Sequence, residues 1–283
     1  MRRWWSWALL APPLLVLLGL FVGPLLYLFY VSLHPPSMSE LYGPGLTLAT
    51  YVQIFSDPFY YTIIRRTLGT AAVILAASLV IGYPVAYLIA QLPARRRTLA
   101  MLVLLFPLMV SNVVRAYGWI AILGRQGVLN EALRALHLID VPLFILNTPE
   151  AVVIGLLTIL LPYMTISIAN TLAGLDPRYQ EAAQALGAGP VRTFLFVTLP
   201  LSSPGIASGL LLVFLLTLSA YVTIALLGGP RSKLLVSLVY DNVVAFQWPL
   251  AAAISFVLLA VALAVTALIL AVLRPGRVRS GAR

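Results

Sequence analysis

Apolar runs of about 20 to 25 residues recur along this chain from one end to the other. An apolar helix of about 20 residues is long enough to cross the hydrocarbon core of a bilayer. We therefore predict six membrane-spanning helices, over residues 13–33, 67–92, 99–123, 151–172, 206–227 and 250–273. The expected fold is all-α. It is one polytopic transmembrane domain over residues 1–283, with an outer loop at 34–62 that contains a short helix at 48–55.

The composition supports a membrane protein and excludes several classes of function. Hydrophobic residues make up 61% of the chain and charged residues 9%, which leaves too little polar surface to cover a soluble globule. The chain has no cysteine and its two histidines lie far apart, so neither thiolate chemistry nor a metal site is expected. The net charge of +10 is spread around the apolar runs, which argues against nucleic-acid binding.

The positions of lysine and arginine predict the orientation in the membrane. Eleven of the 18 basic residues fall on one side of the predicted spans and six on the other. Cytoplasmic loops carry the excess of Lys and Arg in membrane proteins. We therefore expect both termini in the cytoplasm, together with the four tail arginines, Arg274, Arg277, Arg279 and Arg283.

The stretch 176–200 lies between the fourth and fifth predicted spans, on the cytoplasmic side. Asp176 followed by proline is typical of a helix start, and Gly187 is typical of a helix end. A second short helix is expected over 191–198, ended by Pro200. Two short helices at an angle can dock into the groove of a partner protein, and an ordinary interfacial loop is the alternative.

The order of residues within this stretch is specific. Glu-Ala-Ala is followed after three residues by Gly, then after nine residues by an aliphatic residue, and after one more residue by Leu-Pro. The residues at these positions are Glu181, Ala182, Ala183, Gly187, Val197, Leu199 and Pro200. This pattern resembles the EAA loop of the permease subunits of bacterial ABC importers, with Val197 where the family usually has Ile. The resemblance implies the type I importer permease fold, a place in the bacterial inner membrane, and a loop that couples to a cytoplasmic ATPase.

The resemblance also implies partner chains. No Gly-rich loop of this sequence ends in Gly-Lys-Ser or Gly-Lys-Thr, so we expect a transport subunit without enzymatic activity, cofactor or metal of its own. ATP and Mg²⁺ then belong to two separate ABC ATPase subunits. A single EAA loop implies a second permease subunit, here a homologous one, and an extracytoplasmic solute-binding protein completes such an importer.

Two further stretches point to a narrower group. Residues 111–133 and 219–230 are similar to stretches in the first permease subunit of spermidine and putrescine importers, although Ile224 stands where many relatives have proline. Relatives of those subunits also handle opines, aminoalkyl phosphonates and other small solutes. A polyamine is therefore the favoured cargo, and a small anion or zwitterion is the alternative.

Arg115 is the only arginine well inside an apolar run. A charge costs roughly 2.5 kcal/mol or more there, so Arg115 should face a cavity, a partner or a carboxylate, and snorkelling or a structural pair is the alternative. Pro84, Pro107 and Pro162 each interrupt a span, and such breaks suit helices that line a cavity. The other candidates for the translocation pathway are Trp119, one helical turn after Arg115, Ser219, Tyr221 and Thr223 in the fifth span, and Asp241 at the outer mouth. Hydrogen bonds between helices are the alternative role for the fifth-span residues.

The charge pattern leaves the cargo open. No Asp or Glu lies inside a predicted span, so a polycation would pass Arg115 without a counter-charge from this chain. A secondary transporter is the alternative from another class, but it would need intramembrane carboxylates or broken helices for ion coupling, and usually an internal repeat. A membrane-embedded enzyme would need a constellation of nucleophile, base or metal ligands at one depth, and the sequence has no cysteine, no histidine in a predicted span and no Gly-x-Ser-x-Gly motif.

Overall fold

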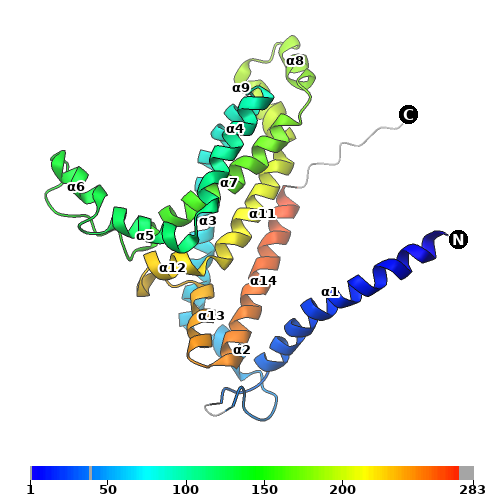
Figure 1. Cartoon of the computed structure of the whole chain (residues 1–283), viewed down its shortest axis with the longest axis vertical. Helices are drawn as coiled ribbons and strands as arrows, with labels where there is room; N and C mark the ends of the chain where they lie inside the picture. The colour runs from blue at the N-terminus through cyan, green and yellow to red at the C-terminus, as the bar shows by residue number, and fades with distance from the viewer. Residues whose placement is uncertain (1, 38–39, 274–283) are drawn as a thin grey trace.

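The computed structural model describes residues 2–37 and 40–273, and every regular element in them is helical. Four helices are long and apolar enough to cross a membrane without interruption. They are α1 (Arg2–Ser32), α3 (Pro58–Ala90), α7 (Pro149–Ala173) and α14 (Trp248–Val272) (Figure 1). These helices confirm the first, second, fourth and sixth predicted spans. The four tail arginines that helped to orient the chain lie outside the described residues.

The start of α3 differs from the prediction. The helix begins at Pro58 and not at residue 67, because Asp57 Oδ1 accepts a 2.8 Å hydrogen bond from Phe59 N, and a proline in the first turn loses no helical hydrogen bond. The outer loop is therefore shorter than predicted. The short helix expected within it is confirmed as α2 (Ala49–Ser56).

The third predicted span, 99–123, is wrong as a continuous helix. Its elements are α4 (Ala94–Leu105), the 3-10 turn η1 (Phe106–Met109), α5 (Asn112–Leu123) and, beyond the span, α6 (Val128–Ala135). The helical stretches before and after the break differ in direction by 87°. Pro107 has no N–H for the helical ladder and Val110 is extended, with ψ at 135°, so the chain turns here. α5 and α6 extend sideways from the bundle (Figure 1).

The fifth predicted span, 206–227, is also wrong as one helix. α11 (Ser203–Ser219) ends at Ala220, whose φ of −80° and ψ of 58° match an inverse γ-turn. α12 (Tyr221–Leu227) then starts in a new direction (Figure 1). The segment after it, which was expected to be a loop, contains the 3-10 turn η3 (Pro230–Ser232) and the helix α13 (Leu235–Val244).

α7 occupies the centre of the bundle and packs against α3 and α11. Met164 and Ile168 of α7 are fully buried. Glycine allows α11 to approach α7 closely, because a Cβ added at Gly205 would lie 2.5 Å from Thr171 Oγ1. Close approach through small residues is a common way of packing membrane helices, and it fixes the spacing of α7 and α11 here.

α1 is the least buried of the four continuous membrane-spanning helices. It packs mainly against α14, where the rings of Phe29 and Phe256 meet edge-on with centroids 5.2 Å apart. Its N-terminal part leans away from the other helices (Figure 1). The other helices of this chain therefore leave most of the apolar surface of residues Ala11–Ser32 uncovered.

Candidate functional site

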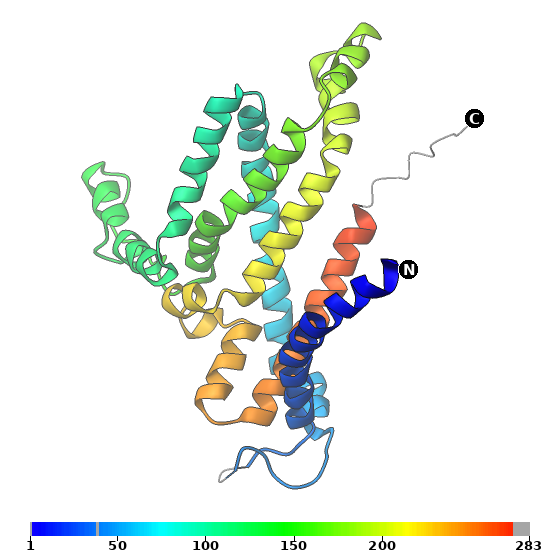
Figure 2. The ribbon, with the colours of Figure 1, turned by 45° about the vertical axis from the view of Figure 1, so that its right-hand side comes forward.

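The segment 176–200 projects from the end of the bundle at which α3 leads into α4 (Figure 2). Its first helix, α8 (Arg178–Ala185), starts where the sequence predicted, because Asp176 Oδ1 accepts a 2.9 Å hydrogen bond from Arg178 N. No residue of α8 is buried. The pattern residues on this helix are Glu181 and Ala182, which are exposed, and Ala183, which is partly exposed.

Gly187 ends the first helix, as predicted. Its φ of +86° is a left-handed conformation that glycine adopts without steric strain. The amide of Gly187 donates to Gln184 O at 2.9 Å, and the next amide, of Ala188, donates to Ala183 O at 3.0 Å. These two bonds form a Schellman motif, which satisfies carbonyl groups that the helix end leaves free.

The second helix of the segment is longer than predicted. Helical turns run from Pro190 to Leu201 as α9 (Pro190–Thr193), the π-helical turn η2 (Phe194–Thr198) and α10 (Leu199–Leu201). The prediction that Pro200 ends this helix is wrong. Pro200 has no N–H to donate, and in the wider π turn before it Leu199 N donates to Phe194 O instead, so the chain stays helical past the proline. Leu199 is partly exposed and Pro200 is exposed.

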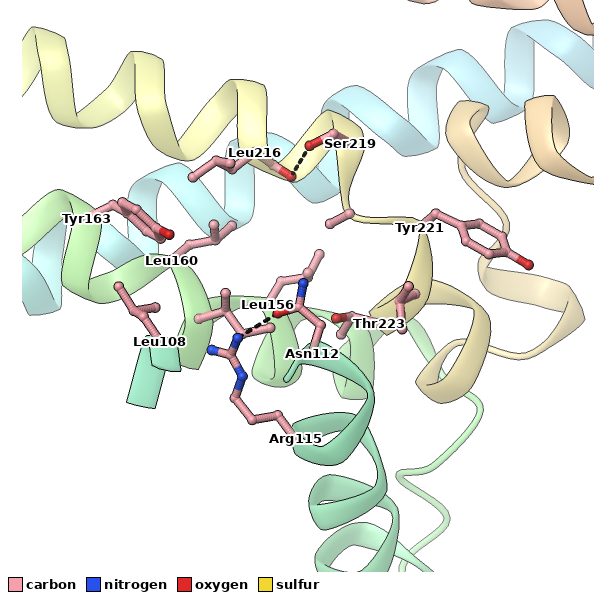
Figure 3. Close-up of a pocket in the computed structure, with 13 residues that line it drawn as sticks. Leu108, Asn112, Arg115, Leu156, Leu160, Tyr163, Leu216, Ser219, Tyr221 and Thr223 are labelled. Carbon is pink, nitrogen blue, oxygen red and sulfur yellow. Dashed lines mark hydrogen bonds between the residues drawn. The ribbon is translucent and has the colours of Figure 1, made fainter. Parts of the chain in front are cut away.

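A second candidate site is a cavity of about 310 Å³ lined by α5, α7, α11 and α12 (Figure 3). It lies where both broken spans leave the bundle. At membrane depth, backbone groups freed by such breaks are tolerated only where they line a cavity or are buried in protein. Four of the predicted pathway residues line this cavity, namely Arg115, Ser219, Tyr221 and Thr223.

The guanidinium of Arg115 is only partly satisfied. Its Nη2 donates a 2.5 Å hydrogen bond to Asn112 Oδ1, while Nε and Nη1 are buried without a partner among the described residues. No Asp or Glu of the described chain lines the cavity. In Figure 3 the group points toward Leu108 and Leu160. The cavity therefore carries a positive charge with free hydrogen-bond donors.

Trp119 does not line the cavity, although it lies one turn after Arg115. Its indole Nε1 donates a 3.2 Å hydrogen bond to Thr158 Oγ1. Thr158 belongs to α7, so this bond holds α5 against the central helix. The structure places Trp119 where it positions α5.

Tyr221 connects the first cavity to a second one, of about 290 Å³, that also contains Asp241. The ring of Tyr221 points away from Arg115 (Figure 3) and stacks on the ring of Tyr240, with centroids 4.0 Å apart. Asp241 Oδ2 accepts a 2.6 Å hydrogen bond from Lys233 Nζ, and this ion pair is partly exposed. The two cavities thus differ in charge, since the first holds a cation alone and the second a neutralised pair.

The other two fifth-span residues have local partners. Ser219 Oγ donates to Leu216 O at 3.1 Å. Thr223 is buried, and its methyl group would lie 3.0 Å from a Cβ added at Gly155 of α7. Ser219 is exposed and can turn its hydroxyl toward a solute, whereas Thr223 mainly packs α12 against α7.

Sequence reasoning missed two residues that line the first cavity and one that stacks on a residue of both cavities. Asn112 and Tyr163 line the first cavity, and Tyr240 stacks on Tyr221. Asn112 precedes Arg115 by three residues, a spacing that places both on one helix face and could have indicated the pair. Tyr240 has no comparable signal, because its contact depends on how α12 and α13 pack.

The sequence of residues 79–277 matches the family of binding-protein-dependent transport system inner membrane components. The chain belongs to this family. The spermidine/putrescine transport system permease protein PotB of Escherichia coli (strain K12) is 37% identical to it over 218 residues, which cover 75% of this chain and 77% of PotB. The inner membrane ABC transporter permease protein YdcU of the same organism is 32% identical over 263 residues, covering 88% of this chain and 83% of YdcU.

Solved structures share the fold. A chain in the crystal structure of a bacterial ABC transporter involved in the import of alginate has a TM-score of 0.75 at 20% identity, covering 98% of this chain and 97% of that chain. A second structure, of an alginate transporter in complex with a periplasmic protein bound to an alginate pentasaccharide, has a TM-score of 0.76 at 19% identity, covering 95% of this chain and 93% of that chain. The type I importer permease fold is confirmed. The four continuous helices and two bent helix pairs give up to six crossings by length and composition; the bent pairs are Ala94–Met109 with Asn112–Ala135, at 87°, and Pro190–Leu201 with Ser203–Ser219, at 60°.

Family membership decides between the classes that the sequence left open. The chain is a permease subunit of an ABC importer and a multi-pass protein of the inner membrane. It is a transport subunit and not an enzyme. Permease subunits of this family carry no cofactor, and the ATPase is a separate chain. The secondary transporter and the membrane-embedded enzyme are thereby excluded.

Proposed function

We propose that residues 1–283 form one transmembrane domain that supplies half of the translocation pathway of an importer. The other parts are a second, homologous permease subunit, two ABC ATPase subunits that hold ATP and Mg²⁺, and an extracytoplasmic solute-binding protein. A pair of ATPases offers two docking clefts and this chain has one segment 176–200, so a second permease fills the second cleft. The complex of the alginate transporter with a periplasmic protein supports the last partner.

The segment 176–200, called the coupling segment from here on, contacts the ATPase. The residues proposed for this role are Glu181, Ala182, Ala183, Gly187, Leu199 and Pro200. The supporting observation is that α8 carries no buried residue and that Leu186, at its end, is 90% exposed. A large apolar side chain at an aqueous end of a membrane protein is more stable when a partner covers it.

The proposed pathway runs through the two cavities that meet at Tyr221. The observation that carries this proposal is the pair of helix breaks at residues 110–111 and 220, which opens the first cavity within the bundle. The pathway residues on this chain are Arg115, Ser219, Tyr221, Thr223 and Asp241, with Trp119 holding α5 in place.

The proposed cargo is a polyamine such as spermidine or putrescine. The similarity of this chain to PotB, a permease protein of a spermidine/putrescine transport system, supports this class of solute. The second cavity offers the matching chemistry, because it is lined by a carboxylate, Asp241, and by Tyr221, whose ring stacks on that of Tyr240. An organic ammonium group is attracted both by a carboxylate and by the face of an aromatic ring.

A solute with an acidic group is the second candidate, and one observation favours it. The two buried donors of Arg115, Nε and Nη1, have no partner among the described residues, and a carboxylate or phosphonate can accept a charge-assisted hydrogen bond from such a guanidinium. Opines and aminoalkyl phosphonates combine such an acid with an amine.

ATP hydrolysis by the reconstituted importer, together with its binding protein, tests the cargo. The panel contains spermidine, putrescine, an opine and an aminoalkyl phosphonate. The polyamine proposal predicts stimulation by the first two alone. Stimulation only by the opine or the phosphonate would establish the second candidate instead, and stimulation by none of the four would contradict both.

A further inference from the structure

The coupling segment is fastened to α3 by an aromatic cluster. The ring of Phe194, in the π-helical turn η2, meets the ring of Tyr83 edge-on at a centroid distance of 5.6 Å and an angle of 86°. It meets Tyr87 in the same way, at 5.8 Å and 87°. Tyr83 and Tyr87 are four residues apart on α3 and so form one face of that helix. Edge-to-face contacts of this kind add specific attraction to the burial of the rings.

A buried hydrogen bond makes a second attachment beside the first. Tyr83 Oη and Ser202 Oγ lie 2.9 Å apart, and Ser202, between α10 and α11, is fully buried. Because an unsatisfied buried hydroxyl is costly, this bond resists separation of the two elements. Tyr83 therefore contacts the chain on both sides of α10, at Phe194 and at Ser202.

The exposed part of the coupling segment is linked to the same turn. Gln180 of α8 donates through Nε2 to Thr198 Oγ1 at 3.3 Å, and Thr198 is buried in η2. A displacement of α8 therefore acts on η2 directly. π-helical turns inside helices are rare and occur frequently at functional sites.

α3 is easiest to bend at the position where Phe194 touches it. Pro84 follows Tyr83 and cannot donate the helical hydrogen bond to Val80 O. One residue before Tyr83, Gly82 lies against α7, where an added Cβ would be 3.0 Å from Thr165 Oγ1. Helix α7 lines the first cavity. The contacts thus lead from α8 through Phe194 and α3 to the wall of the cavity.

We propose that Phe194, held between Tyr83 and Tyr87, is the positioning residue that passes movement of the coupling segment to α3 and so to the cavity. This role rests on the proposed contact of the coupling segment with the ATPase. It does not depend on which solute is carried. Loss of the Phe194 ring should leave ATP hydrolysis in place and disconnect it from the cavity.

The absence of cysteine from this chain makes a direct test available. Ser219, which is exposed at the cavity, is replaced by cysteine as a reporter in the complete reconstituted importer. Labelling of this chain by a charged maleimide is compared with and without ATP and vanadate, so no solute is needed. With Phe194 present, we expect the labelling rate to change by about fivefold or more, the size of an ordinary coupling between sites.

Phe194→Ala should abolish most of that change while the subunits still co-purify and ATP is still hydrolysed. Phe194→Tyr, which keeps the ring, should restore it. Phe196→Ala is the matched control, since Phe196 lies in the same turn but is 76% exposed. If Phe194→Ala weakens assembly, Tyr87→Leu removes one ring contact from the other side and should reduce the change as well.

Two results would overturn the role of Phe194. One is a full nucleotide-dependent change in Phe194→Ala or in Tyr87→Leu, and the other is an equal loss in Phe196→Ala. A reporter that fails to respond even with Phe194 in place would instead overturn the proposed pathway or its coupling to the ATPase, and the role of Phe194 with it. Labelling of the reporter protein that retains Phe194 therefore distinguishes failure of the Phe194 role from failure of the proposed pathway and coupling.

Discussion

The rings of Tyr221 and Tyr240 stack with their centroids 4.0 Å apart, and Tyr221 belongs to the lining of both cavities. On one side of this pair lies the guanidinium of Arg115, two of whose nitrogens have no partner among the described residues, and on the other lies the ion pair of Lys233 and Asp241. A charged solute therefore meets different electrostatic surroundings before and after Tyr221. Four predictions follow from the cavities, the coupling segment and the packing of the bundle.

Arg115→Ala should impair transport far more than assembly. Removing this charge costs the fold little, because the desolvation penalty of its two unsatisfied donors, Nε and Nη1, disappears with it. Loss of a charged hydrogen bond from Arg115 to the solute or to another residue of the cavity wall costs about 1.5 to 3 kcal/mol, which lowers uptake by roughly tenfold to a hundredfold. Uptake by proteoliposomes and co-purification of subunits measure the two effects. A variant that assembles poorly while its assembled fraction transports normally would show that Arg115 is structural.

Lys233→Met and Asp241→Asn should shift the spermidine dependence of uptake in opposite directions. The methionine variant frees the carboxylate for the solute, and the asparagine variant removes it. An exposed ion pair contributes up to about 1 kcal/mol, so shifts of up to about fivefold and normal folding are expected. Half-maximal concentrations for spermidine uptake provide the measurement. Equal shifts in both variants would rule out Asp241 as a site for the ammonium group.

Gly187→Leu should leave the membrane helices inserted but detach the ATPase. A side chain at φ +86° strains the backbone by about 1 to 2 kcal/mol, which displaces the end of α8. Gly189→Leu is the matched control, because Gly189 has φ at −67° and open space around it. The ratio of ATPase to permease after purification reports the effect. Normal co-purification and uptake in Gly187→Leu would remove the basis for the coupling segment.

Gly205→Ala should destabilise the bundle by about 1 to 3 kcal/mol, the usual cost of overpacking. The added methyl group would lie 2.5 Å from Thr171 Oγ1 and 3.0 Å from Ser167 O, and the backbone oxygen cannot move aside easily. Gly69→Ala is the control, since nothing lies within 4 Å of a Cβ at that helical position. Thermal unfolding in detergent should separate the two variants. An unchanged midpoint in Gly205→Ala would mean that α7 and α11 are less closely packed than described.

Hydropathy predicted the four continuous spans well because their apolar length alone decides that they cross a membrane. It could not predict the two breaks, since composition carries no information on direction. Pro107 did indicate an interruption, but not a turn of 87°. At Ala220 there is neither Gly nor Pro. The nearest signals are Thr217 and Ser219, whose hydroxyls bond to backbone oxygens and weaken a helix only slightly.

The sites were predictable to different degrees. Arg115 could be selected because an isolated charge in an apolar run is costly and needs a reason. The helix end at Gly187 could be read from local backbone chemistry. The pairing of Asp241 with Lys233 could not be predicted, because Lys233 precedes α13 and Asp241 lies within it, and this segment was expected to be a loop. Contacts between elements, such as Phe194 with Tyr83, are set by packing and leave no local pattern.

The packing of α1 against α14 has a consequence for biosynthesis. These are the first and the last of the described helices to leave the ribosome, and the edge-on rings of Phe29 and Phe256 cannot meet until both have entered the membrane. Until then α1 stays among lipids without its main partner, and contacts so distant in sequence form slowly. In an incompletely synthesised chain that lacks α14, the face of α1 that carries Phe29 therefore stays in contact with lipid.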